Sequence, residues 1–188
     1  MGCSIKFGPD AVGALMFTFT LTYLTQVVHT DRSLALTAVS IGSAANLLTI
    51  PLFGSLSDRW GRRSIYLIGV GFAIVWTAVL FKLLDTAIPS VVILAVVIGL
   101  VIHASLWGTQ ASFITEQFPT RLRYTGSSLS YTFAGILAAA TPAALVALQA
   151  QFQAGWAPAA YVIFLLLVTG LIVLVSTGRP VDEAEKQA

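Results

Sequence analysis

Residues 54–63 read Gly-Ser-Leu-Ser-Asp-Arg-Trp-Gly-Arg-Arg and form a charged stretch between two apolar runs. Four charged side chains lie within six positions, namely Asp58, Arg59, Arg62 and Arg63. Charge is scarce in the chain as a whole, because only 10% of the 188 residues are charged and 57% are hydrophobic. A soluble domain carries about 25% charged residues, because its surface faces water. The composition therefore predicts a membrane protein in which residues 54–63 connect two apolar segments.

The apolar residues fall into six runs, each with about the 20 residues that a helix needs to cross a hydrocarbon core of ~30 Å. These runs lack the alternation of apolar and polar residues that marks a membrane-spanning strand. We therefore expect an all-α, polytopic membrane protein, with a six-transmembrane-helix bundle over residues 1–178 and a cytoplasmic tail over 179–188. The expected spans are residues 11–28, 34–53, 65–84, 90–113, 126–148 and 158–178.

The distribution of Lys and Arg predicts the orientation, because cytoplasmic loops carry an excess of these residues. With the N-terminus in the cytoplasm, eight of the ten Lys and Arg residues fall on the cytoplasmic side. Only Arg32 and Lys82 fall outside. We expect both termini in the cytoplasm, and residues 57–64 as a cytoplasmic turn between the second and third helices.

The chemistry of this turn suggests more than a membrane anchor. Gly54 and Gly61 allow a close approach of backbones and a sharp turn. Asp58 lies at the membrane edge, where its carboxylate is expected to pair with Arg62 or with a neighbouring helix end. A plain membrane anchor needs only scattered Lys and Arg, so it accounts for neither Asp58 nor the two glycines.

At these residues the sequence resembles a known family. The stretch "GSLSDRWGRR" is similar to the G-x-L-x-D-R-x-G-R-R loop signature of the major facilitator superfamily. The stretch "ASFITEQFPTRLRYTGSSLSY" (111–131) resembles the loop between the tenth and eleventh helices in the metabolite:proton symporter branch. The similarity extends over most of residues 15–170.

The resemblance implies one half of a twelve-helix fold, with the solute site near the membrane midplane between two six-helix halves. The two loops match the C-terminal half, so we expect a missing N-terminal six-helix half or, less favoured, a homodimer partner. The implied function is secondary active transport of a small polar or organic-acid solute by proton symport and alternating access. The implied location is a bacterial plasma (inner) membrane.

Polar residues inside membrane helices are rare, so each one is a candidate for the solute or proton pathway. In the fourth span, residues Gly99, His103, Trp107 and Gln110 recur at spacings of four, four and three and share one helix face. His103 is expected near the midplane. The alternative is a histidine that only bonds a neighbouring Ser or Thr.

Further pathway candidates lie on other helices, and they are Tyr23, Gln26, Asn46 and Tyr131. Asn46 has the alternative of joining helices through a hydrogen bond. In the second cytoplasmic loop, Glu116 lies within sequence reach of Arg121 and Arg123. We expect a structural ion pair there rather than a proton site.

No Asp or Glu is expected in the middle of a span, which leaves His103 as the titratable group at depth. The main coupling carboxylate is therefore expected in the missing half. A six-helix membrane enzyme and a structural membrane subunit are the alternatives. An enzyme requires a nucleophile with its base, or a metal-binding set, and no such pattern is visible. We expect no enzymatic activity, cofactor, metal or nucleic-acid partner.

Overall fold

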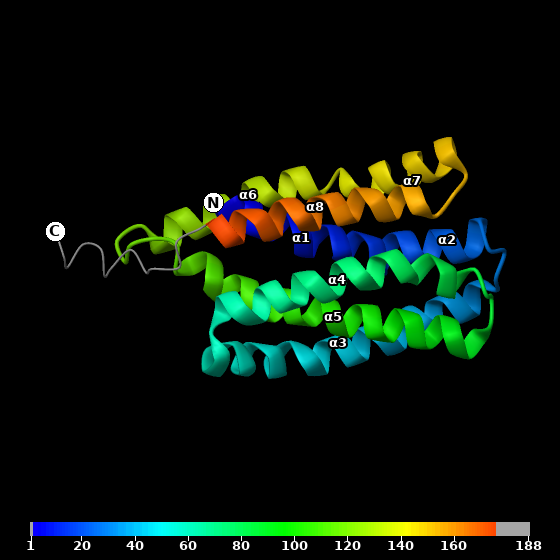
Figure 1. Ribbon diagram of the computed structural model, residues 1–188, viewed down its shortest axis with the longest axis horizontal. Coiled ribbons are helices and arrows are strands. Elements are labelled where there is room, and N and C mark those ends of the chain that lie inside the picture. The colour runs from blue at the N-terminus through cyan, green and yellow to red at the C-terminus, as the bar shows by residue number, and fades with distance from the viewer. Residues whose placement is uncertain (1, 176–188) are drawn as a thin grey trace.

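The computed structural model describes residues 2–175, with side chains from residue 5 onward, and this part of the chain is helical between short connections. The helices run up and down along one long axis (Figure 1). The elements are α1 (Gly2–Gly13), the π-helix η1 (Ala14–Phe19), α2 (Thr20–Gln26), α3 (Arg32–Trp60), α4 (Arg62–Leu84), α5 (Pro89–Thr115), α6 (Arg123–Ala138), α7 (Thr141–Phe152) and α8 (Trp156–Val175).

Five of the expected spans are helices long and apolar enough to cross a membrane. They are α3, α4, α5, the combined segment Arg123–Phe152, and α8. Within Arg123–Phe152, the helix breaks between Ala138 and Thr141, and Pro142 lies in the first turn of α7. Proline suits a helix start, because its missing N–H is not needed there.

The first apolar run is also helical, but it differs from the expected span 11–28. Helix begins at Gly2 and continues to Gln26 through α1, η1 and α2, none of which alone reaches the length of a span. The helix includes Lys6 and Asp10, which lie four residues apart and form an ion pair. Because each charge compensates the other, these two polar residues are accommodated in a helix that packs into the bundle.

A proline inside α1 produces one of the contacts that attach this helix to the bundle. Pro9 has no N–H, so the carbonyl of Ile5 loses its usual partner in the helix. The hydroxyl of Tyr66 in α4, a fully buried side chain, donates a hydrogen bond to this carbonyl. The interior of the bundle therefore satisfies the group that the proline leaves free.

The helix connections lie at two opposite ends of the bundle (Figure 1). We call them the Gly61 end, with the α3–α4 turn and residues 116–122, and the Asp85 end, with the α4–α5 turn. Helix α1 begins and α8 ends at the Gly61 end (Figure 1). The expected turn over residues 57–64 is shorter than predicted, because α3 continues to Trp60 and α4 starts at Arg62. Gly61 makes the whole turn with a φ of 89°, a backbone conformation that favours glycine.

Helix α5 is at the centre of the bundle and packs against α1, α3, α4 and α6. Its closest approach is to α3, where a Cβ atom added to Gly108 would lie 2.6 Å from the carbonyl oxygen of Ile50. Gly54 lies at the same crossing of α3 and α5, because a Cβ atom added to it would lie 3.7 Å from the carbonyl oxygen of Gly108. Small residues at such a crossing permit the backbone contact that holds membrane helices together.

We expect Gly108→Ala to force α3 and α5 apart and to destabilise the bundle by about 1–3 kcal/mol, as overpacking does in other proteins. The matched control is Gly71→Ala, because nothing lies within 4 Å of a methyl group added to Gly71. Thermal unfolding followed by circular dichroism in detergent measures both variants. Equal stability of the two would show that the α3–α5 contact is not close packed.

Candidate functional site

A cavity of about 390 Å³ opens between the first helical segment, α3 and α5. We call it the histidine cavity. Its lining combines a carboxylate, an imidazole, an amide and an indole with apolar groups. The polar lining residues are Asp10 from α1, Asn46 from α3, and His103 and Trp107 from α5.

An amide and an imidazole meet at the back of this cavity. The Nδ2 atom of Asn46 lies 3.1 Å from Nδ1 of His103 and donates to the carbonyl of Leu100 at 2.6 Å. If Asn46 also donates to Nδ1, the imidazole accepts there and carries its proton on Nε2. The Nε2 atom is buried without a hydrogen-bond partner among the described residues. Asn46 thus joins α3 to α5 and orients the ring of His103, whereas the expected alternative of a Ser or Thr partner is not seen.

Aromatic rings and a glycine complete the surroundings of His103. Trp107 stacks on the imidazole with ring centroids 5.5 Å apart, and Phe17 meets it edge-on at 5.6 Å. A Cβ atom added to Gly13 would lie 3.2 Å from Nε2 of His103, so glycine provides room for the ring. The expected face therefore brings His103 and Trp107 together, but Gln110 is buried away from this lining, with its Oε1 atom unpartnered among the described residues.

The sequence-based interpretation missed an ion pair beside this cavity. The Lys6 ammonium lies 2.5 Å from Oδ2 of Asp10, and the two side chains are only 10% and 9% exposed. The ammonium also lies over two rings, 5.7 Å from the centroid of Trp107 and 5.4 Å from that of Tyr131. The sequence analysis placed Asp10 just before the first span, whereas the first helix begins at Gly2, nine residues before the expected start, and includes Asp10. The i, i+4 spacing of Lys6 and Asp10 was the signal that could have revealed the pair.

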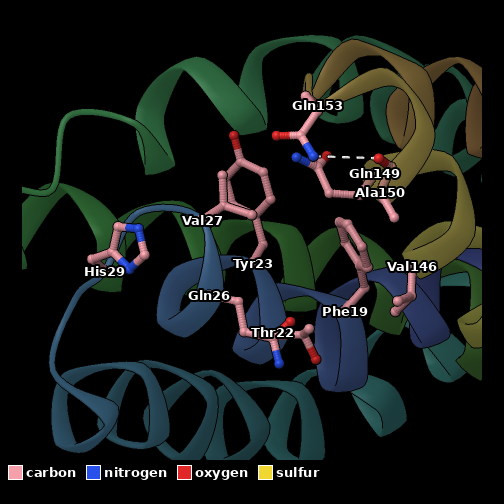
Figure 2. A pocket seen from close by; sticks show the side chains of 10 residues that line it. All are labelled: Phe19, Thr22, Tyr23, Gln26, Val27, His29, Val146, Gln149, Ala150 and Gln153. Carbon is pink, nitrogen blue, oxygen red and sulfur yellow. Dashed lines mark hydrogen bonds between the residues drawn. The ribbon is translucent and has the colours of Figure 1, made fainter.

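A second cavity of about 310 Å³ lies toward the Asp85 end, between the first segment and α7 (Figure 2). It contains the expected candidates Tyr23 and Gln26, together with Gln149 and Gln153, which the sequence did not single out. The hydroxyl of Tyr23 donates to Oδ1 of Asp85 at 2.6 Å, so this residue also ties α2 to the end of α4. The structure therefore separates Tyr23 and Gln26 from the histidine cavity.

At the Gly61 end, Arg62 connects three helices. Its Nη2 and Nε atoms donate to Oδ1 of Asp58 at 2.9 and 3.2 Å, so the expected pair of Asp58 and Arg62 is present. Its Nη1 atom donates to Glu116 at the end of α5. Glu116 thus pairs with an arginine of the first loop instead of the expected Arg121 or Arg123.

The other arginines of the two loops lie around this centre. Arg63 donates to the carbonyl of Leu174 in α8 at 2.7 Å. Arg59 and Arg121 are exposed, and Arg123 is half-buried. Arg62 links the two loops directly, through Asp58 in the first and Glu116 at the start of the second.

Comparison with known proteins identifies the family. The family profile described as Major Facilitator Superfamily matches residues 10–188, nearly the whole chain. The chain therefore belongs to the major facilitator superfamily, a family of helical membrane transporters, not of enzymes. No solved structure matches the chain significantly.

The similar curated proteins are bacterial transporters. The putative transporter YdfJ of Escherichia coli (strain K12) is 28% identical over 178 residues, which cover 92% of this chain and 41% of that protein. The glycine betaine/proline/ectoine/pipecolic acid transporter OusA of Dickeya dadantii (strain 3937) is 28% identical, with 93% and 35% covered. The shikimate transporter of Escherichia coli (strain K12) is 27% identical, with 92% and 39% covered. The chain thus spans 35% to 41% of the length of these relatives.

The position of Arg62 leads to a prediction about the Gly61 end. Arg62→Ala removes the contacts of this side chain to α3 and to α5. The backbone amides at the start of α4 and the end of α5 should then exchange hydrogen roughly 2–5-fold faster. This factor corresponds to the loss of about 0.5–1 kcal/mol of ion pairing. Arg59→Ala is the matched control, because Arg59 is exposed. Hydrogen exchange measured by mass spectrometry provides the comparison. Equal protection in both variants would contradict the linking role of Arg62.

Proposed function

We propose that this chain forms the C-terminal six-helix half of a secondary active transporter, with residues 1–178 as the membrane half and 179–188 as its tail. It moves a small polar or organic-acid solute by alternating access, coupled to proton symport. The single observation that carries this proposal is the histidine cavity, which presents polar groups inside an otherwise apolar helix bundle. Intramembrane polar groups of this kind mark solute and ion pathways.

Proton coupling is assigned to His103. Imidazole is the side chain whose charge changes most readily near neutral pH, and this one lines the cavity where a solute would bind. A protonated ring would give the solute a cationic partner, whereas the neutral ring offers only hydrogen bonds. Proton binding and solute binding would then favour each other, which is the requirement for symport.

The orientation follows from charge. Lys6 is buried in the bundle and no longer counts as a loop charge, yet seven Lys and Arg residues remain on the predicted cytoplasmic side against two outside. We therefore assign the Gly61 end and both termini to the cytoplasm of a bacterial inner membrane. The bacterial transporters among the relatives support this location.

The partner is a second six-helix half, since the members of this family combine two such halves around one solute site. The length of the relatives, of which this chain spans 35% to 41%, is consistent with that arrangement. In this account Asp58, Gly54 and the arginines of residues 54–63 control the inward–outward equilibrium and do not contact solute.

Uptake into vesicles tests the proposal. Vesicles that contain this chain together with the N-terminal half of a relative such as YdfJ should accumulate a solute in a saturable, proton-dependent manner. Vesicles with this chain alone should not, because the cavity then faces lipid. His103→Gln keeps a hydrogen-bonding side chain and should abolish proton dependence, whereas Gln110→Leu, outside the cavity, should preserve it. Robust proton-dependent uptake by the chain alone would overturn the two-half account in favour of a half-size homodimer.

A further inference from the structure

We propose that Asp10, Trp107 and Tyr131 form a subsite for the ammonium group of a solute, and that the Lys6 ammonium of the same chain occupies this subsite until the solute displaces it. The inference rests on the proposed transport function and specifies the chemical class of the solute. It identifies an ammonium-bearing molecule, such as a zwitterion, as the preferred ligand.

The surroundings of Lys6 are those of a cation-binding site. A carboxylate oxygen of Asp10 lies 2.5 Å from the ammonium, and the rings of Trp107 and Tyr131 lie within 6 Å of it. The faces of aromatic rings attract cations, and a carboxylate supplies the opposite charge. The three groups come from α1, α5 and α6, so the fold assembles the subsite from distant parts of the sequence.

The same groups also belong to the cavity. Asp10 and Trp107 line the histidine cavity, so a solute bound there meets two of the three groups that hold Lys6. A structural lysine could be held by partners facing away from any open space. Here the ion pair borders a volume of about 390 Å³, which leaves room for an incoming cation.

Charge balance favours exchange of one cation for another. If Lys6 left without replacement, Asp10 would remain as an uncompensated carboxylate in a buried position, which is strongly unfavourable. A solute ammonium restores the balance, whereas a solute carboxylate would add a second negative charge beside Asp10. The imidazole of His103 lines the same cavity and can meet the polar or anionic end of the solute.

The side chain of Lys6 can reach the membrane surface when a solute displaces it. It lies in the second turn of α1, a helix that begins at the Gly61 end of the bundle (Figure 1). A lysine near a helix end can extend its flexible stem toward the membrane surface and keep its charge in water. Displacement therefore moves the charge along the side chain without any change in the helix.

The first test uses the wild-type chain, assembled with the N-terminal half of a relative such as YdfJ in lipid nanodiscs, and tetramethylammonium as the probe. Saturating tetramethylammonium should raise the rate of reductive methylation of the Lys6 amine severalfold, as measured by mass spectrometry. Lys82, in the last turn of α4 at the opposite end, is the internal reference and should not change. tert-Butanol has a similar shape without charge and should have no effect. No rise at Lys6, or an equal rise with tert-butanol, would overturn the proposal.

The second test removes the internal competitor. Lys6→Ala should bind radiolabelled tetramethylammonium at least tenfold more tightly than wild type, and a further Asp10→Asn or Tyr131→Leu change should abolish the gain. Lys82→Ala is the matched control and should leave binding unchanged. Unchanged affinity of folded Lys6→Ala for tetramethylammonium would contradict the proposal. An equally large gain in affinity for the anion pivalate would also contradict it. The wild-type methylation test remains decisive if Lys6→Ala does not fold.

These outcomes are separable from those of the transport test. Displacement of Lys6 by tetramethylammonium without uptake in the two-half vesicles would keep the subsite and reject the proposed transport. Uptake without displacement would keep the transport and reject the subsite.

Discussion

A polar group inside an apolar helix bundle needs a partner from the protein, because the membrane interior provides no water to bond it. This constraint explains the contacts that join the helices of this chain. The carbonyl freed by Pro9 receives the Tyr66 hydroxyl, and Asn46 reaches from α3 to the backbone and imidazole of α5. Lys6 and Asp10 neutralise each other within α1. Each of these contacts fixes one helix against another or permits a polar residue to lie inside.

The constraint also concentrates function in one region. Several buried Ser and Thr side chains of the bundle bond to the backbone of their own helical segment, as Thr20 does with the carbonyl of Leu15. His103 and the Lys6–Asp10 pair differ, because they border an open cavity. The π-helix η1 follows directly after α1, where the first segment passes His103, and such irregular turns are frequent at functional sites.

Much of the architecture could be predicted from the sequence, since runs of about 20 apolar residues have one stable form in a membrane. Helices α3, α4, α5 and α8 and the pairing of Asp58 with Arg62 are present as expected, whereas the single span expected over residues 126–148 is divided into α6 and α7. The start of the first helix was missed, because a reading of hydropathy alone treats Lys6 and Asp10 as loop residues and does not use their i, i+4 spacing. The link of Glu116 to Arg62 was missed because the two residues are 54 positions apart in the sequence, and only the packing of the helices brings them together.

Both proposals require that residues 5–13 form a helix packed into the bundle. Hydrogen exchange of these backbone amides in lipid nanodiscs tests this directly. The account predicts that the amides of residues 10–13 exchange as slowly as those in the centre of α5, because their donors are bonded within a buried helix. Exchange within seconds, at the rate of an unstructured peptide, would contradict it and would remove Asp10 and Lys6 from the cavity.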